Sequence, residues 1–187
     1  PVALSGEIYD RSGVYFDPFR GVYVLSLKTL NGIYRRSRNY LAEKDPELLV
    51  SLAHRTFDFT SDKFIRYWFK AEENDPRHPD FPEIRPQIYN HEAMPYEDIL
   101  LGYFTVWQGP ENNVCDQLRT QKRNEVLIGW SLNGRDWIRD SIPFLPVSPI
   151  KEAWNAGNVQ STNGNPLIVG DSLYFYVSGR FNNPEWE

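Results

Sequence analysis

Short apolar runs separated by turn residues dominate the chain, which is the pattern of strands rather than helices. Residues 14–16 and 22–27 flank the connection 17–21, whose sequence Asp-Pro-Phe-Arg-Gly suits a β-hairpin loop. Further runs of the same kind cover residues 99–107, 125–131, 167–169 and 173–178. Turn residues such as Asn133-Gly134 close these runs. The pattern predicts an all-β fold built from hairpins.

Two segments depart from this pattern. Asp45 and Pro46 precede a short apolar run over residues 47–50, which predicts a helix with Asp45 as its N-cap and Pro46 at its first position. Four prolines and many charges between residues 72 and 86 exclude a central strand there. We therefore expect a long loop over about residues 70–96, and we expect it to line the rim of a site because long loops in compact domains are usually functional.

The hairpins group into loosely repeated units at about residues 10–66, 97–145 and 158–187. The first unit closes at residues 56–59 (Thr-Phe-Asp-Phe), and the second closes at residues 131–137, which end in Trp137. A period of about 40 to 60 residues with several short strands per unit is typical of propeller blades. The units predict one β-propeller domain; a β-sandwich with irregular hairpins is the alternative.

Composition narrows the classes of partner. Aromatic residues make up 15% of the chain, a share that suits an all-β core and also a cleft in which rings stack on sugars. The net charge of −5 argues against binding nucleic acid, which requires a basic surface. No apolar run approaches the roughly 18 residues of a membrane span.

Cysteine and histidine indicate no further chemistry. A single Cys115 excludes an internal disulfide, and three scattered histidines lack the spacing of zinc ligands. The arginines at positions 35, 36 and 38 favour a structural or solvated role. The chain begins at Pro1 without an initiator methionine, so we expect that its N-terminus was cut, processed or left out, and its first residues indicate no localisation.

Residues 12–21 (SGVYFDPFRG) resemble the opening motif of a bacterial family of glycoside-hydrolase-like proteins. The resemblance continues in order through residues 89–90, 96–97, 101–102, 107–110, 122–126, 154–161 and 169–180. It covers nearly the whole chain and implies a five-bladed β-propeller with distant kinship to invertases, levansucrases and arabinanases. The chain accounts for about two and a half blades, so the resemblance also implies that the remaining blades of the parent protein lie outside it.

Glycosidases use two carboxyl groups that flank the scissile bond. In the related propellers these acids lie at the start of the innermost strand of successive blades. By this resemblance Asp10 corresponds to the transition-state stabiliser and Glu97 to the general acid, and the nucleophile or base is expected upstream of Pro1. The alternative for Glu97 is a hydrogen bond to a neighbouring blade. Asp17 lies within a hairpin loop, where we expect it to cap the turn.

Five further residues are candidates for binding a sugar substrate. Glu92 beside His91 is the competing carboxylate, while Asn158 and Gln160 offer neutral donors and acceptors. Trp154 suits either a stacking platform or packing between blades. No metal site is indicated, and the sequence gives no support for the axial Ca²⁺ that some arabinanase-like propellers hold.

These residues predict a glycoside hydrolase whose paired carboxylates lie in the propeller funnel. A non-catalytic carbohydrate-binding propeller is the alternative, and a purely structural interaction domain is a third interpretation. The first two differ in one geometric respect. Hydrolysis requires two carboxylates on one site, about 5 to 9.5 Å apart, so Asp10 and Glu97 should converge.

Overall fold

The computed structural model of the chain describes residues 5–6, 9–31, 35–53, 56–57, 66–162 and 164–181, and these form an all-β fold as predicted. The strands are β1 (Ser5–Gly6), β2 (Gly13–Asp17), β3 (Val22–Asn31), β4 (Arg35–Glu43), β5 (Thr56–Phe57), β6 (Arg66–Phe69), β7 (Gln87–Tyr96), β8 (Ile99–Gly109), β9 (Arg123–Ser131), β10 (Ile138–Arg139), β11 (Asn158–Thr162), β12 (Leu167–Val169), β13 (Ser172–Tyr174) and β14 (Val177–Arg180). The helices are α1 (Pro46–Ala53) and α2 (Asn112–Leu118). Among the described residues, no helix is long and apolar enough to cross a membrane.

The first sheet contains strands β2, β3, β4 and β6 in chain order, each antiparallel to the next. The hairpin between β2 and β3 is held by Asp17, whose Oδ1 accepts the backbone N–H groups of Phe19 at 3.0 Å and Arg20 at 3.2 Å. Its side chain also pairs with the Arg20 guanidinium. The turn-capping role predicted for Asp17 is confirmed. Helix α1 also begins as predicted, because Asp45 Oδ1 accepts the N–H of Glu47 at 2.8 Å.

The second sheet contains β7, β8, β9 and β10, again in chain order and antiparallel. Its first strand, β7, covers residues 87–96, so the long loop predicted for residues 70–96 is wrong over its last ten residues. Within the stretch 70–96, residues 70–86 lie outside helices and strands. The second sheet therefore begins at Gln87 rather than at residue 97, where we placed the second unit.

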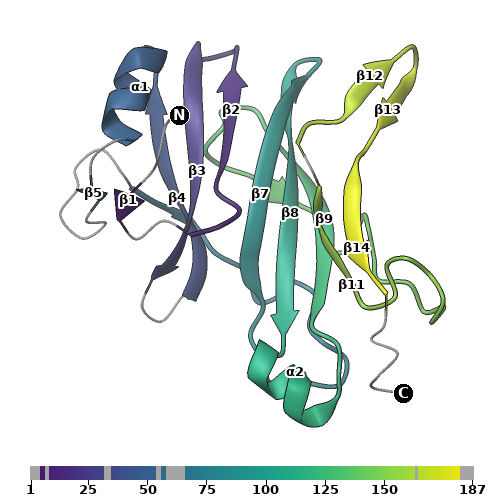
Figure 1. The fold of residues 1–187 in the computed structure, drawn as a ribbon. Helices are drawn as coiled ribbons and strands as arrows, with labels where there is room; N and C mark the ends of the chain where they lie inside the picture. Colours follow the sequence, from purple (N-terminus) through teal and green to yellow (C-terminus); the bar gives the residue numbers. More distant parts are fainter. Residues whose placement is uncertain are drawn as a thin grey trace.

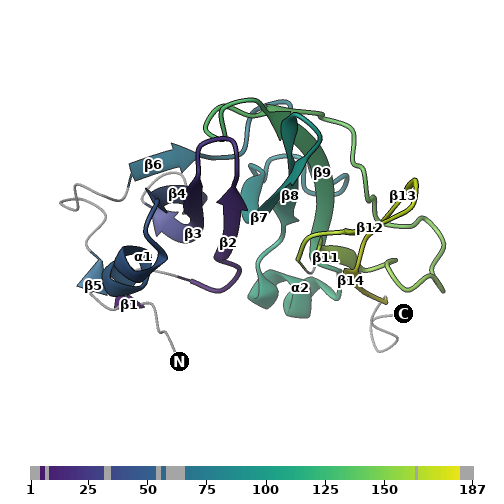
Figure 2. The ribbon, with the colours of Figure 1, turned by 90° about the horizontal axis from the view of Figure 1, so that it is seen from above.

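The third sheet consists of the antiparallel pair β11–β14, and the hairpin β12–β13 extends from it. Figure 1 shows the three sheets side by side in chain order, and Figure 2 shows the same order from above. We call β2, β7 and β11 the leading strands, since each is the first strand of its sheet. Strand β7 packs against β2 and β4 of the first sheet, and β11 packs against β9 and β8 of the second. Parts of two predicted units, residues 58–59 and 182–187, lie outside the described residues.

Apolar residues from facing sheets form the core. One group contains Tyr15, Val24, Tyr40, Ala93 and Leu100, a second contains Ile88, Phe104, Val106 and Leu127, and a third contains Met94, Tyr103, Val126 and Val159. Trp137, which follows the turn after β9, packs against the first two groups. Side chains brace this turn, because Ser131 Oγ accepts the N–H of Gly134 at 2.8 Å and Asn133 Oδ1 accepts the N–H of Asp136 at 2.8 Å.

Close packing between β9 and β10 gives the first prediction. A Cβ atom on Gly129 would lie 2.6 Å from the carbonyl oxygen of Ile138, which is backbone and has little freedom to move. We expect Gly129→Ala to lower the free energy of unfolding by about 1–3 kcal/mol, as measured by urea denaturation. Leu132→Ala, at an exposed position of the following turn, is the control and should change it by less than about 0.5 kcal/mol. Wild-type stability in Gly129→Ala would contradict the pairing of β9 with β10.

Candidate functional site

Glu97 lies in the tight turn between β7 and β8, where its backbone has a positive φ of 48°. It lines a pocket of about 340 Å³ together with residues of the β12–β13 hairpin. Asp10 instead contacts Tyr89, eight residues earlier on β7, which corresponds to about 26 Å of strand at roughly 3.3 Å per residue. Asp10 and Glu97 therefore do not converge. The predicted pairing fails because β7, and not the strand after Glu97, leads the second sheet.

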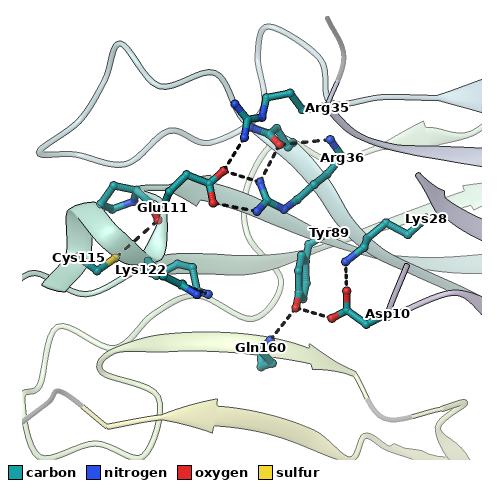
Figure 3. A network of polar contacts seen from close by, with 12 residues as sticks. Asp10, Lys28, Arg35, Arg36, Tyr89, Glu111, Cys115, Lys122 and Gln160 are labelled. Carbon is teal, nitrogen blue, oxygen red and sulfur yellow. Dashed lines mark hydrogen bonds and ion pairs between the residues drawn. The ribbon is translucent and has the colours of Figure 1, made fainter. Parts of the chain in front are cut away.

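A different set of polar side chains meets around Asp10 (Figure 3). The Asp10 carboxylate pairs with Lys28 Nζ and accepts a hydrogen bond of 2.9 Å from the Tyr89 hydroxyl. Gln160 Nε2 in turn donates to the Tyr89 oxygen at 3.4 Å. We call Asp10, Lys28, Tyr89 and Gln160 the Asp10 cluster. It joins the segment before β2 with β3, β7 and β11, so the leading strands β7 and β11 each contribute a residue to it.

Burial and charge set the protonation states in the Asp10 cluster. Burial raises the pKa of Asp10, but the hydrogen bonds from Lys28 and Tyr89 and the charge of Lys28 outweigh it, so the net pKa is lowered. Desolvation lowers the pKa of Lys28, and Asp10 opposes that effect. Desolvation and then the Asp10 carboxylate raise the pKa of Tyr89. At neutral pH the cluster therefore contains an ionised carboxylate and a protonated phenol. The Asp10 side chain is 65% exposed, so a ligand can reach it.

Glu92 lies three residues beyond Tyr89 on the same strand. Its Oε2 accepts hydrogen bonds from Thr162 Oγ1 at 2.7 Å and from the N–H of Gly164 at 3.1 Å. Its Cγ would lie 3.9 Å from a Cβ added at Gly13, the first residue of β2. Glu92 therefore lies beside both neighbouring leading strands, β2 and β11.

The buried Arg38 connects these groups. Its side chain is fully buried and donates to Ser26 Oγ, to the carbonyl of Arg11 at 3.0 Å and to the carbonyl of Tyr89 at 3.5 Å. Desolvation lowers the pKa of Arg38 to about 9, while the charges of Glu92 and Asp10 act in the opposite direction. Arg38 is therefore a cation at pH 7. Its structural role agrees with the sequence interpretation.

His91 is a core residue. Its side chain is 0% exposed, its ring centre lies 4.7 Å from that of Phe104 and 5.0 Å from that of Trp68, and its Nδ1 lies 3.0 Å from Ser26 Oγ. Desolvation and the charge of Arg38 hold its pKa well below the usual value, so the ring is neutral. The predicted contact between His91 and substrate does not fit this position. We correct His91 to a packing residue between the first and second sheets.

The other two predicted binding residues lie outside the Asp10 cluster, Asn158 at the start of β11 and Trp154 in the loop before that strand. Asn158 is 2% exposed, donates to the Lys122 carbonyl at 3.3 Å and borders a pocket of about 310 Å³ beside Lys122 and Arg180. Trp154 is half-exposed, and its ring covers Gly179 of β14. Of the five predicted sugar-binding residues, Gln160 belongs to the Asp10 cluster and Glu92 lies near it.

A second polar network adjoins the cluster and was not predicted. Glu111 binds Arg36 through both carboxylate oxygens, each at 3.0 Å, and also contacts Arg35 at 3.1 Å (Figure 3). Gln87 Oε1 accepts a hydrogen bond of 3.0 Å from Arg36. These contacts fix the beginnings of β4 and β7. The chain carries no local signal for them, since Arg36 and Glu111 are 75 residues apart.

Comparison with known proteins assigns the chain to no family. No protein-family model matches the chain, and no curated protein is similar enough to count as a match. Within the part of the chain that the structure describes, no group of three or more His, Cys, Asp or Glu side chains is arranged to hold a metal ion.

The Asp10–Lys28 pair gives a pH-dependent prediction. The pKa of Asp10 is lower in the folded protein than in the unfolded chain, so its contribution to stability is complete above about pH 4 and is lost as pH falls through the folded pKa. We expect Asp10→Asn to cost about 1 kcal/mol at pH 7, because Lys28 loses its counter-ion while Asp10 is largely solvated.

Urea denaturation of both proteins between pH 7 and pH 3 tests this prediction. The difference in unfolding free energy should be constant from pH 7 to 5 and should shrink below pH 4. A difference that persists unchanged at pH 3 would show that Asp10 is not paired with Lys28. Asp171→Asn, at an exposed position in the turn of the β12–β13 hairpin, is the matched control.

Proposed function

We propose that the chain binds carbohydrate at the Asp10 cluster, as part of a β-propeller in which its three sheets are consecutive blades. The observation that carries the binding proposal is the Tyr89 hydroxyl on β7, which bridges Asp10, in the segment before β2, and Gln160 on β11. The cluster presents a carboxylate acceptor and a phenol, and the buried amide of Gln160 is bonded to the phenol. Sugar hydroxyls both donate and accept hydrogen bonds, so they match this set.

Two features support the propeller. The sheets follow one another in chain order, and the leading strands β7 and β11 each pack on the preceding sheet. Both flanks of the stack also expose apolar side chains: Val14 and Phe16 on β2 are 63% and 44% exposed, while Ile168 and Tyr176 near the other end are 57% and 60% exposed. In a propeller, the neighbouring blades would cover these exposed apolar side chains. The remaining blades of a parent protein are the partners that this proposal assigns to these two flanks.

Hydrolysis of a glycosidic bond is the second candidate function, with Glu92 in place of Glu97. It is favoured by the positions of Asp10, ahead of β2, and Glu92, on β7. The negative charges of both residues oppose the desolvation that lowers the pKa of Arg38, so both carboxylates lie within electrostatic range of its guanidinium. The ionised Asp10 suits stabilisation of a developing positive charge on the sugar, and Glu92 supplies the second carboxyl group. If the protein does not hydrolyse the sugar, the same residues would serve a carbohydrate-binding propeller.

Binding is tested by isothermal titration of the full-length protein with neutral arabino-, fructo- and manno-oligosaccharides. For the oligosaccharide that binds, we expect Tyr89→Phe and Gln160→Ala each to weaken affinity by about tenfold, the effect of losing one well-formed hydrogen bond. Glu97→Gln is the matched control at the far end of β7 and should bind like wild type. Loss of binding in Glu97→Gln alone would move the site to the β7–β8 turn and contradict the proposal.

Turnover of aryl glycosides by the same proteins separates hydrolysis from binding. We expect Glu92→Gln to lower kcat by about 10² to 10⁴, the range for a general acid or base, while Glu97→Gln keeps wild-type turnover. Equal turnover in Glu92→Gln and wild type would remove Glu92 from catalysis. Oligosaccharide binding without turnover would leave the binding function alone.

A further inference from the structure

The loop before β7 lines a pocket that shares no residue with the Asp10 cluster. It has a volume of about 590 Å³ and lies between residues 70–86, the first residue of β4 and the first residue of β7. Its charged lining consists of Arg35, Lys70, Arg77, Arg85, Glu72 and Glu73. Cations outnumber acids there, although the whole chain has a net charge of −5. The volume falls within the range of small-molecule sites.

One of the two acids is engaged from outside the pocket. The Glu72 carboxylate lies 3.7 Å from Nη2 of Arg139 on β10. The same nitrogen binds Asp75 at 2.6 Å, and both Arg139 and Asp75 are buried. Glu72 therefore helps to balance a cation of the second sheet. Glu73 is the other acidic side chain of the lining, and among the described residues it forms no ion pair.

The arginines of the pocket are held in place but incompletely neutralised. Arg35 shares the single carboxylate of Glu111 with Arg36, and its own side chain is 62% exposed. Arg77 Nη1 donates to the Pro82 carbonyl at 3.1 Å, which fixes the fold of the loop and holds the guanidinium within the lining. Arg85 is exposed, and within the described part of the chain no hydrogen bond or ion pair engages it. These guanidinium groups retain donors that can face a ligand.

We propose that this pocket binds the anionic oxygen group of a small polar molecule, a carboxylate or a phosphate. Guanidinium groups present paired N–H donors that match the oxygens of both anions. Asp10 and Glu92 are acidic side chains of the proposed sugar site, and their negative charge disfavours an anion at that site. The arginines favour an anion in the pocket that they line. The inference rests on the lining of the pocket and stands apart from the proposed sugar-binding function.

The test is an NMR titration of the full-length protein at low ionic strength with D-glucuronate, D-glucose and inorganic phosphate. We expect glucuronate, phosphate or both to shift the backbone amide signals of residues 70–87, and we expect glucose to leave them unchanged. Glucuronate alone would identify a carboxylate ligand, and phosphate alone would identify a phosphate ligand. A response to glucose equal to that of glucuronate, or no response to either anion, would overturn the proposal.

Two variants that remove the same charge locate the effect. Arg85→Gln should weaken binding of the anion by about tenfold. Arg135→Gln, an exposed arginine in the β9–β10 turn that does not line the pocket, should not. Equal weakening in the two variants would mean a general charge effect and would contradict a site. Because Arg85 lies outside the Asp10 cluster, binding of a neutral oligosaccharide should survive in Arg85→Gln, so failure of one proposal is distinguishable from failure of the other.

Discussion

The buried guanidinium of Arg38 is the interaction on which the arrangement of the first two sheets depends. From β4 it reaches the carbonyl groups of Arg11, ahead of β2, and Tyr89, on β7. A cation this deep is costly unless its donors are bonded and opposite charge lies nearby. Asp10 and Glu92 supply that charge. Because Asp10 directly precedes Arg11, the contacts of Arg38 also bring the Asp10 carboxylate to the Tyr89 hydroxyl. The carboxylates of the candidate site thus also act as counter-ions of the core.

Features set by neighbouring residues could be predicted from the sequence. The Asp17 turn, the Asp45 helix cap and the Ser131–Trp137 turn all depend on contacts within a few positions of the chain. Strand β7 was missed because polar residues interrupt its apolar pattern at Asn90, His91 and Glu92. The structure buries His91 among aromatic rings and pairs it with Ser26, 65 residues earlier. Such tertiary contacts override local pattern.

The missed strand explains the outcome at the site. Because the sequence did not predict β7, we assigned the strand after Glu97 as the first strand of its sheet. Glu97 was therefore placed at the start of a leading strand, although that start is Gln87 at the beginning of β7. Asp10 and Gln160 were predicted singly, and the structure brings both to Tyr89. The partners Tyr89 and Lys28 could not be found from spacing, since Tyr89 lies 79 residues from Asp10 and 71 from Gln160. Only the packing of β7 against the first sheet and of β11 against the second brings these positions together.

The convergence of β7 with the segment before β2 at the Asp10 cluster is the central claim, and the titration of the Tyr89 hydroxyl tests it most directly. NMR of protein labelled with ¹³C at the tyrosine Cζ atoms, with Tyr89→Phe to assign the signal, would follow this group between pH 8 and pH 12. The structure predicts that the pKa of Tyr89 lies above its ordinary value and falls in Asp10→Asn, which removes a negative charge and a charged hydrogen-bond acceptor. An identical titration of Tyr89 in wild type and Asp10→Asn would contradict the account.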